Sequence, residues 1–168
     1  LRSVKQALSE VKLVIVTGGL GPTVDDLTRT VLSEATGIPL RESQNVLEMI
    51  ESRFRTMGKT MADNNRCQAQ VPTHGIYLPN PHGTAPGLIF DSGDRLTVAL
   101  PGPPHELEPM VLDNMIPFLE GRLSLGKKST TCNLYFSCIG ESNIDQVVRE
   151  KLSSIDDLTI SLLHRVGV

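Results

Sequence analysis

The fold of this chain is decided by the segment KLVIVTGGLGPTVDDLT, residues 12–28. Its first part, residues 12–17, is a continuous apolar run, which is typical of a strand buried on both faces of a parallel sheet. Pro22 stands where a first helical position would be, and the pattern predicts a helix from there to about Ala35, ended by Gly37. A strand, a glycine-rich turn and a helix in this order begin an α/β unit.

The rest of the chain alternates in the same way. Residues 1–10 already have a helical pattern without a preceding cap, so the chain is expected to begin inside an element. Further helices are predicted from Ser43 to Gly58 and over 105–119 and 142–152, and strands over 76–78, 88–90, 96–100, 130–137 and 158–163. We therefore expect an α/β domain over residues 1–121 and the incomplete start of a second small α/β unit over 122–168.

Composition excludes several classes of function. The formal net charge of −3 argues against an unspecific binder of nucleic acid or of anionic membranes, which would carry a basic excess. Three cysteines without CxxC spacing (Cys67, Cys132 and Cys138) indicate reduced thiols rather than a disulfide framework or a zinc site. No apolar run reaches the length of about 18 residues that a membrane span needs, and no signal peptide is visible, so a cytoplasmic location is expected.

The glycine-rich turn suits a phosphate. After a strand and before a helix, Gly18, Gly19 and Gly21 would let backbone N–H groups and a helix dipole point at one anion. The turn lacks the Lys-Ser/Thr pair of a P-loop, and Val24 replaces the third glycine of a dinucleotide fingerprint. It therefore predicts a phosphate site outside both standard nucleotide motifs.

Asp25 and Asp26, a few residues further on, would repel such a phosphate. At a separation of 4 Å the repulsion is about 4 kcal/mol for an effective dielectric constant of 20. One interpretation is that both acids favour the dipole of the following helix, at about 0.3–1 kcal/mol each. The other is that they hold a divalent cation together with the phosphate, as carboxylates do in magnesium sites.

Two more glycine-proline turns are expected at the same edge of the sheet. The segment PGPPHEL follows strand 96–100, and NPHGTAPG joins strands 76–78 and 88–90. Ligands of open α/β sheets bind beyond the carboxyl ends of the strands, so we expect the three turns to form one cleft. Glu106 is either a dipole-matching residue or a second acid that faces the ligand. The predicted phosphate-binding residues are Gly18, Gly19, Gly21, Thr23, Asn80, Gly83, Thr84 and Gly102.

Four segments resemble a known family. GGLGPTVDDLT, NNRCQAQVP, NPHGTAPG and LPGPPHEL occur in the order and spacing of the molybdopterin-binding-like domain of the competence/damage-inducible protein A (CinA) family, over about residues 1–120. Gly140-Glu141-Ser142 is similar to the small KH-like segment that follows this domain in the family. Members also have a preceding strand and helix and a C-terminal deamidase domain, which this sequence is expected to lack.

The resemblance implies a three-layer α/β/α sandwich with a mostly parallel sheet, as in molybdenum-cofactor biosynthesis proteins. It also implies that Asp26 matches a functional acidic position, that the glycine loop holds a phosphorylated pterin such as molybdopterin, and that the chain forms homo-oligomers. In this family the domain is associated with ADP-ribose pyrophosphatase activity that depends on a divalent metal, Mg²⁺ or a transition metal such as Co²⁺.

Three functions are compatible with these features. The first is metal-dependent hydrolysis of an ADP-ribose-type nucleotide, in which Asp26 and Asp25 hold the metal or orient water and Thr84 donates its hydroxyl to a phosphate. The second is a non-catalytic module that binds molybdopterin or a nucleotide. The third is adenylyl transfer to a pterin, and the fold alone does not choose among them.

Overall fold

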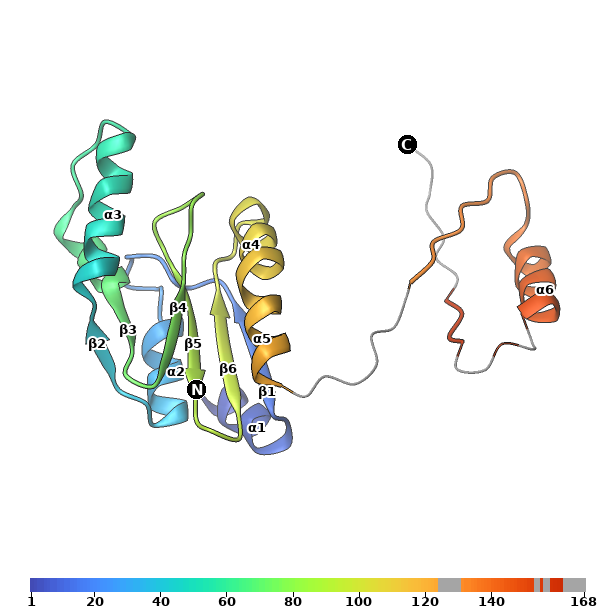
Figure 1. Ribbon diagram of the computed structural model, residues 1–168, viewed down its shortest axis with the longest axis horizontal. Helices are drawn as coiled ribbons and strands as arrows, with labels where there is room; N and C mark the ends of the chain where they lie inside the picture. The colour runs from blue at the N-terminus through green and yellow to red at the C-terminus, as the bar shows by residue number, and fades with distance from the viewer. Residues whose placement is uncertain (124–130, 153–154, 156–157, 162–168) are drawn as a thin grey trace. The chain divides into compact units, whose positions relative to one another are not determined.

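The computed structural model describes residues 1–123, 131–152, 155 and 158–161. The chain forms two compact units, 1–125 and 126–168. In the first unit, a four-stranded sheet has the order β1 (Leu13–Thr17), β6 (Leu96–Leu100), β5 (Gly87–Asp91) and β4 (Gly75–Leu78) (Figure 1). Strands β2 (Leu40–Glu42) and β3 (Gln70–Pro72) form a separate antiparallel pair.

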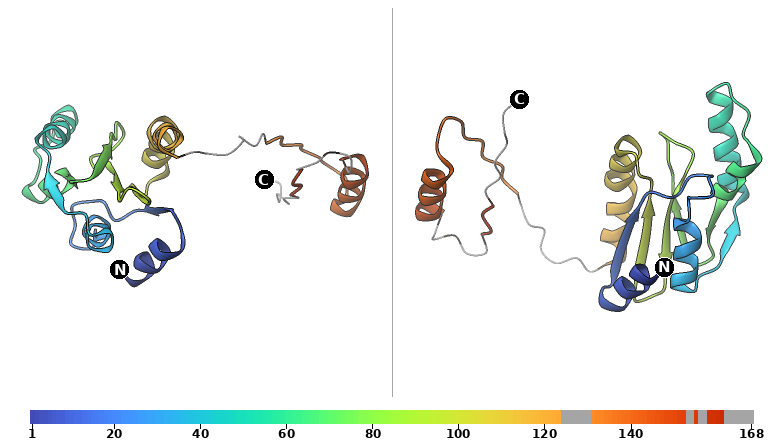
Figure 2. Two further views of the ribbon diagram at one scale, coloured as in Figure 1. Left: turned by 60° about the horizontal axis from the view of Figure 1, so that its bottom comes forward. Right: turned by 180° about the vertical axis from the view of Figure 1, so that it is seen from behind.

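Helices cover both faces of this sheet (Figures 1 and 2). Side chains of α2 (Thr28–Thr36) and α3 (Gln44–Thr56) share one core cluster with Leu88 and Phe90 of β5. The next residue of β5, Ile89, points to the other face and belongs to a second cluster, with the helices α4 (Pro104–Met110) and α5 (Ile116–Arg122). Successive side chains of a strand alternate between faces, so one strand serves two cores. The predicted three-layer α/β/α fold is confirmed.

The sheet is mixed. The expected parallel pairing joins β1 to β6, whereas β6–β5 and β5–β4 are antiparallel. Strand β1 lies at the edge, and Ile15 keeps 45% of its surface exposed. The prediction that this strand is buried on both faces is therefore wrong for the described residues, because an apolar sequence does not fix a strand's place in the sheet order.

The helix predicted from Pro22 begins only at Thr28. Residues 18–27 form a loop instead, in which Gly18 and Gly19 adopt positive φ angles of 85° and 68°. A proline can open a helix, but here the Thr23 N–H bonds the side chain of Asp26 at 2.9 Å. Side chains that bond nearby backbone compete with helix formation.

The other helices of this unit form close to where the sequence predicts them. The Ser43 hydroxyl caps α3 by accepting a hydrogen bond from the Val46 N–H (3.4 Å). The predicted helix 105–119 runs from Pro104 to Arg122, with a π-helical segment, η2 (Val111–Met115), between α4 and α5. Pro117 lies just after this segment, and the wider turn relieves the crowding that a proline ring causes against the preceding turn. The remaining elements of this unit are α1 (Arg2–Glu10) and the 3₁₀ helix η1 (Asp63–Ala69).

In the second unit, α6 (Glu141–Leu152) confirms the predicted helix. The predicted strands do not form over the described residues 131–137 and 158–161, and their other positions, 130 and 162–163, lie outside the described residues. Leu134, Tyr135 and Phe136 are exposed there, and a strand without a partner is not stable by itself. Within the described residues, no helix has the length and apolar character to cross a membrane.

Candidate functional site

The three glycine-containing loops lie at the same end of the four-stranded sheet, beyond the carboxyl ends of β1 and β6. Thr17 is in register with Leu100, so loops 18–27 and 101–103 leave neighbouring parallel strands at the same end. Loop 79–86 joins β4 to β5, and its last residue precedes Gly87, which is in register with Leu78. Because Leu88 is in register with Ala99 of β6, this loop reaches that end as well.

The first and third loops touch through their backbones. The Gly18 N–H donates a hydrogen bond of 2.8 Å to the carbonyl of Leu100. A Cβ placed on Gly102 would lie 3.5 Å from the Cα of Gly18, which is ordinary van der Waals contact. The two turns therefore form one surface beyond the carboxyl ends of β1 and β6, where ligands of α/β sheets bind.

Thr28 fixes loop 18–27 to the start of α2. Its hydroxyl donates to the Gly18 carbonyl (2.8 Å), and its N–H donates to the Gly19 carbonyl (3.2 Å). A Cβ on Gly19 would overlap the Thr28 Oγ1, and the positive φ of Gly19 is also unfavourable for any other residue. Gly19 is thus required by the loop itself.

Asp26 closes the same loop. Its Oδ2 accepts hydrogen bonds from the N–H (2.9 Å) and the hydroxyl (2.7 Å) of Thr23. These bonds, together with the Gly21 N–H and the charge of Arg29, lower the pKa of Asp26 below its usual value. A Cβ on Gly21 would overlap the Asp26 Oδ2, so this glycine makes room for the carboxylate.

Asp25 is exposed, and its carbonyl accepts the N–H of Leu27 (3.0 Å). Neither aspartate stabilises the dipole of α2 from within the helix, since both precede it and its first turn holds no acidic residue. Both aspartates precede the helix by two or three residues, so a dipole interaction would act from outside α2, and this interpretation stays a prediction. The two aspartates differ in role: Asp26 orders the loop, and the Asp25 carboxylate is exposed beside it.

A buried arginine, Arg29, hydrogen-bonds the backbone of loop 18–27. Arg29, only 3% exposed, donates from Nη2 to the Leu20 carbonyl (2.9 Å), and Gln68 Nε2 reaches the same carbonyl at 3.5 Å. Burial lowers the pKa of Arg29, while Cys67 and Asp26 oppose this shift. Sequence reasoning missed Arg29, although its spacing of three from the buried Leu32 placed a charge on an apolar helix face.

The second loop is organised by Asn80, which is 7% exposed. Its Nδ2 donates to the Ala85 carbonyl (2.8 Å) and to Glu106 Oε2 (2.6 Å), and its Oδ1 accepts the N–H groups of His82 and Gly83. Glu106 thus ties α4 to this loop and does more than match the helix dipole. The Asn80 side chain holds the loop in shape.

A pocket of about 500 Å³ is lined by this loop, by α3 and by Asn114. Among the predicted phosphate-binding residues, it is lined by Asn80, Gly83 and Thr84. The glycine turn, both aspartates and Gly102 do not line it. The predicted residues therefore form two groups at one end of the sheet, which are linked through Glu106 and the start of α4.

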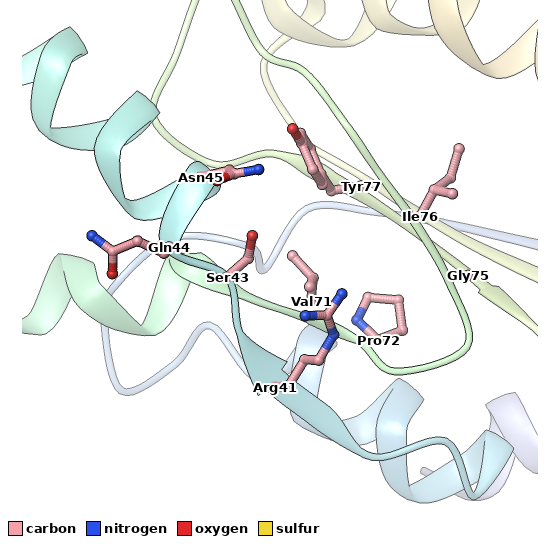
Figure 3. Close-up of a pocket in the computed structure, with 9 residues that line it drawn as sticks. All are labelled: Arg41, Ser43, Gln44, Asn45, Val71, Pro72, Gly75, Ile76 and Tyr77. Carbon is pink, nitrogen blue, oxygen red and sulfur yellow. The ribbon is translucent and has the colours of Figure 1, made fainter.

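A second pocket, of about 590 Å³, lies between β2–β3, the start of α3 and β4 (Figure 3). It is lined by Arg41, Ser43, Gln44, Asn45, Val71, Pro72, Gly75, Ile76 and Tyr77. None of the predicted site residues contributes to it.

The fit of a divalent cation depends on the aspartates. Over the part of the chain that the structure describes, no group of three or more His, Cys, Asp or Glu side chains could hold a metal by itself. Magnesium-like ions also bind through one or two carboxylates and complete their shell with substrate phosphates and water. Asp25 and Asp26 offer the carboxylate oxygens that such an ion takes, although the Asp26 Oδ2 already accepts two hydrogen bonds from Thr23.

Comparisons with known proteins agree with this architecture. A family described as "Probable molybdopterin binding domain" matches residues 1–121. The chain is 45% identical to a "Putative competence-damage inducible protein" of Symbiobacterium thermophilum, over 99% of this chain and 40% of the relative. It is 40% identical to the protein of that name from Caldicellulosiruptor saccharolyticus, over 93% of this chain and 38% of the relative. The chain thus spans about 40% of the length of these relatives.

A solved structure is similar as well. The crystal structure of "the protein CinA with unknown function from Thermoplasma acidophilum" matches with a TM-score of 0.60 and 32% identity. The match covers 71% of this chain and 67% of that one.

Proposed function

The chain belongs to the family of probable molybdopterin binding domains and is CinA-like, and from this premise we propose that it hydrolyses the pyrophosphate of an ADP-ribose-type nucleotide with a divalent metal. The observation that carries the proposal is the hydrogen bond from the Gly18 N–H to the Leu100 carbonyl, which brings together the turns that follow two neighbouring parallel strands, with an ionised Asp26 in the first of these turns.

Each group has a distinct part in this reaction. In the turn at Gly18, Gly19 and Gly21, the Gly19 N–H would donate to one phosphate of the substrate, because the Gly18 N–H already bonds the Leu100 carbonyl and the Gly21 N–H bonds Asp26. Gly18 and Gly21 would contribute by letting the backbone approach the phosphate closely. The Thr84 hydroxyl donates to the phosphorylated ligand from the second loop. Asp26 and Asp25 would hold a divalent ion such as Mg²⁺ or Co²⁺. Such an ion would neutralise phosphate charge and acidify a bound water.

A second candidate is a binding module that holds molybdopterin or a nucleotide without turnover. It is favoured by the Asp26 Oδ2, which already accepts two hydrogen bonds from Thr23 and therefore has a sufficient role in ordering the loop. The two candidates share the ligand site and differ only in whether a metal and a water act on the bound phosphate.

Product analysis separates the candidates. The chain is incubated with ADP-ribose and a series of Mg²⁺, Mn²⁺ and Co²⁺, and AMP and ribose 5-phosphate are quantified, with EDTA as the control. Metal-dependent formation of both products supports hydrolysis. Saturable binding without products favours the module, and adenylyl transfer from ATP to molybdopterin would replace both candidates. Self-association and the neighbouring deamidase domain stay predictions.

A further inference from the structure

The pocket of about 500 Å³ beside loop 79–86 has two unlike walls. One wall is a face of α3, with Met49, Ser52, Arg53 and Thr56 at helical spacing. The other wall is the loop itself, which contributes the aliphatic rings of Pro79, Pro81 and Pro86. Its volume is in the range of sites that hold a small organic ligand.

Among the described residues that line this pocket, Arg53 alone is charged. Its Nε is buried and has no hydrogen-bond partner in the described protein, and none of the described carboxylates forms a salt bridge with it. Arg55, two residues further along the same helix, is instead exposed and paired with Glu51 at 3.7 Å. A buried donor without a partner is unfavourable, so Arg53 is suited to an anionic acceptor that enters the pocket.

Uncharged groups surround this cation. Met49, Ile50 and the proline rings offer apolar surface for a planar ring, and Thr84 brings a hydroxyl from the loop. Asn114 comes from the π-helical segment η2, and such segments are frequent at functional sites. One anion-binding group, an apolar wall and a few hydrogen-bonding side chains together describe a site for a phosphorylated heterocycle.

We infer that this pocket binds the ring-bearing, phosphorylated half of the ligand, of the nucleoside monophosphate class, with its phosphate on Arg53 and its ring against Met49 and the proline wall. The inference rests on the proposed function for the choice of a nucleotide. The pocket shares Asn80 and Gly83 with the loop that Glu106 ties to α4, the helix that follows the turn at Gly102.

Direct binding tests this inference without any catalysis. AMP is titrated by calorimetry into the chain in EDTA, with adenosine, inorganic phosphate and neopterin monophosphate as separate probes. We expect AMP to bind more tightly than adenosine or phosphate, because it engages both walls. Tighter binding of neopterin monophosphate than of AMP would overturn the nucleoside monophosphate class in favour of a pterin. If none of the phosphorylated probes binds, the inference is overturned.

The variant Arg53→Met removes the charge and keeps a long side chain that favours helix. We expect it to weaken AMP binding by about 10- to 100-fold, which is the usual effect of losing a charge-assisted hydrogen bond. The matched control Arg55→Met removes an arginine from the exposed surface of the same helix and should bind as the parent chain does. Equal affinities of the two variants would overturn the inference. Arg53→Gln gives the same test if the Met variant does not fold.

Failure of this inference is distinguishable from failure of the proposed function. Arg53-dependent AMP binding without hydrolysis of ADP-ribose would leave the pocket in place and remove the enzymatic function. Hydrolysis with AMP binding that does not depend on Arg53 would support the reaction and overturn the pocket assignment.

Discussion

Replacing Asp26 by Asn tests the central role given to the carboxylate. The change keeps the size of the side chain and one acceptor oxygen for the Thr23 N–H and hydroxyl, which now lie 2.9 and 2.7 Å from Oδ2. What it removes is the negative charge. Loop 18–27 should therefore keep its shape, whereas a cation held between the aspartates and the phosphates would lose a ligand.

The expected loss of stability is small. A hydrogen bond to a charged group contributes about 1.5–3 kcal/mol and a neutral one about 0.5–1.5 kcal/mol. Both bonds to Asp26 are solvent-exposed, so we discount the difference and expect the free energy of unfolding to fall by about 1 kcal/mol. For a unit of this size the melting temperature should decrease by roughly 3–5 °C.

The expected loss of activity is much larger. Removing a carboxylate from a metal-phosphate site costs several kcal/mol of transition-state stabilisation, so metal-dependent hydrolysis of ADP-ribose should fall by about 100-fold or more. Melting temperature and AMP release are measured on the same preparations.

Asp91→Asn is the matched control. Asp91 also accepts hydrogen bonds, from Arg122 at 2.9 Å. It is the last residue of β5 and is in register with Leu96, so it lies at the end of the sheet away from the glycine turns. This variant should lose stability and keep its hydrolysis rate. If Asp26→Asn folds and hydrolyses ADP-ribose as fast as Asp91→Asn does, the metal role of Asp26 is refuted, and the carboxylate only orders the loop.

Three further predictions follow from the same contacts. Gly21→Val should weaken binding of ADP-ribose more than it lowers stability, because its Cβ would displace the Asp26 carboxylate; unchanged affinity by calorimetry would contradict this. Glu106→Ala should lower the free energy of unfolding in urea by about 1.5–3 kcal/mol, since the mostly buried carboxylate accepts the 2.6 Å bond from Asn80, and Glu106→Gln should lose less. The pKa values of Asp26 and Asp91 are lowered in the folded chain, so their stabilisation is complete above the unfolded pKa of about 3.9 and is lost as the pH falls through the folded values. Urea midpoints should therefore drop below about pH 4, and less steeply in Asp91→Asn.

Much of the architecture could be read from the sequence by itself. The apolar runs over 12–17 and 96–100 give strands, and Ser43 and Gly58 bound a helix whose apolar residues have helical spacing. Turns that follow neighbouring parallel strands meet beyond the carboxyl ends of those strands, and this rule predicts from sequence that the turns at Gly18 and Gly102 lie together. These features are local, or follow from a general rule of sheet topology.

Other features depend on residues far apart in the chain. Pro22 and the aspartates have the local signature of a helix start, yet α2 begins at Thr28, because Thr23 and Asp26 bond each other and the Thr28 hydroxyl reaches back to Gly18. Local propensity is weak, and side-chain hydrogen bonds within a loop overcome it.

The division of the predicted site residues into two groups also depends on tertiary structure alone. Glu106 and Asn80 are 26 positions apart in the sequence, and the periodicity of apolar residues along helices and strands does not predict such a contact. Arg53 and Arg55 have similar sequence neighbours in α3, but Arg53 lines a pocket, whereas Arg55 pairs with Glu51 on the surface. The sequence determined which segments are strands, helices and turns, because those depend on neighbours in the chain. Which charges became buried was decided by packing between elements, since burial depends on what lies across the fold.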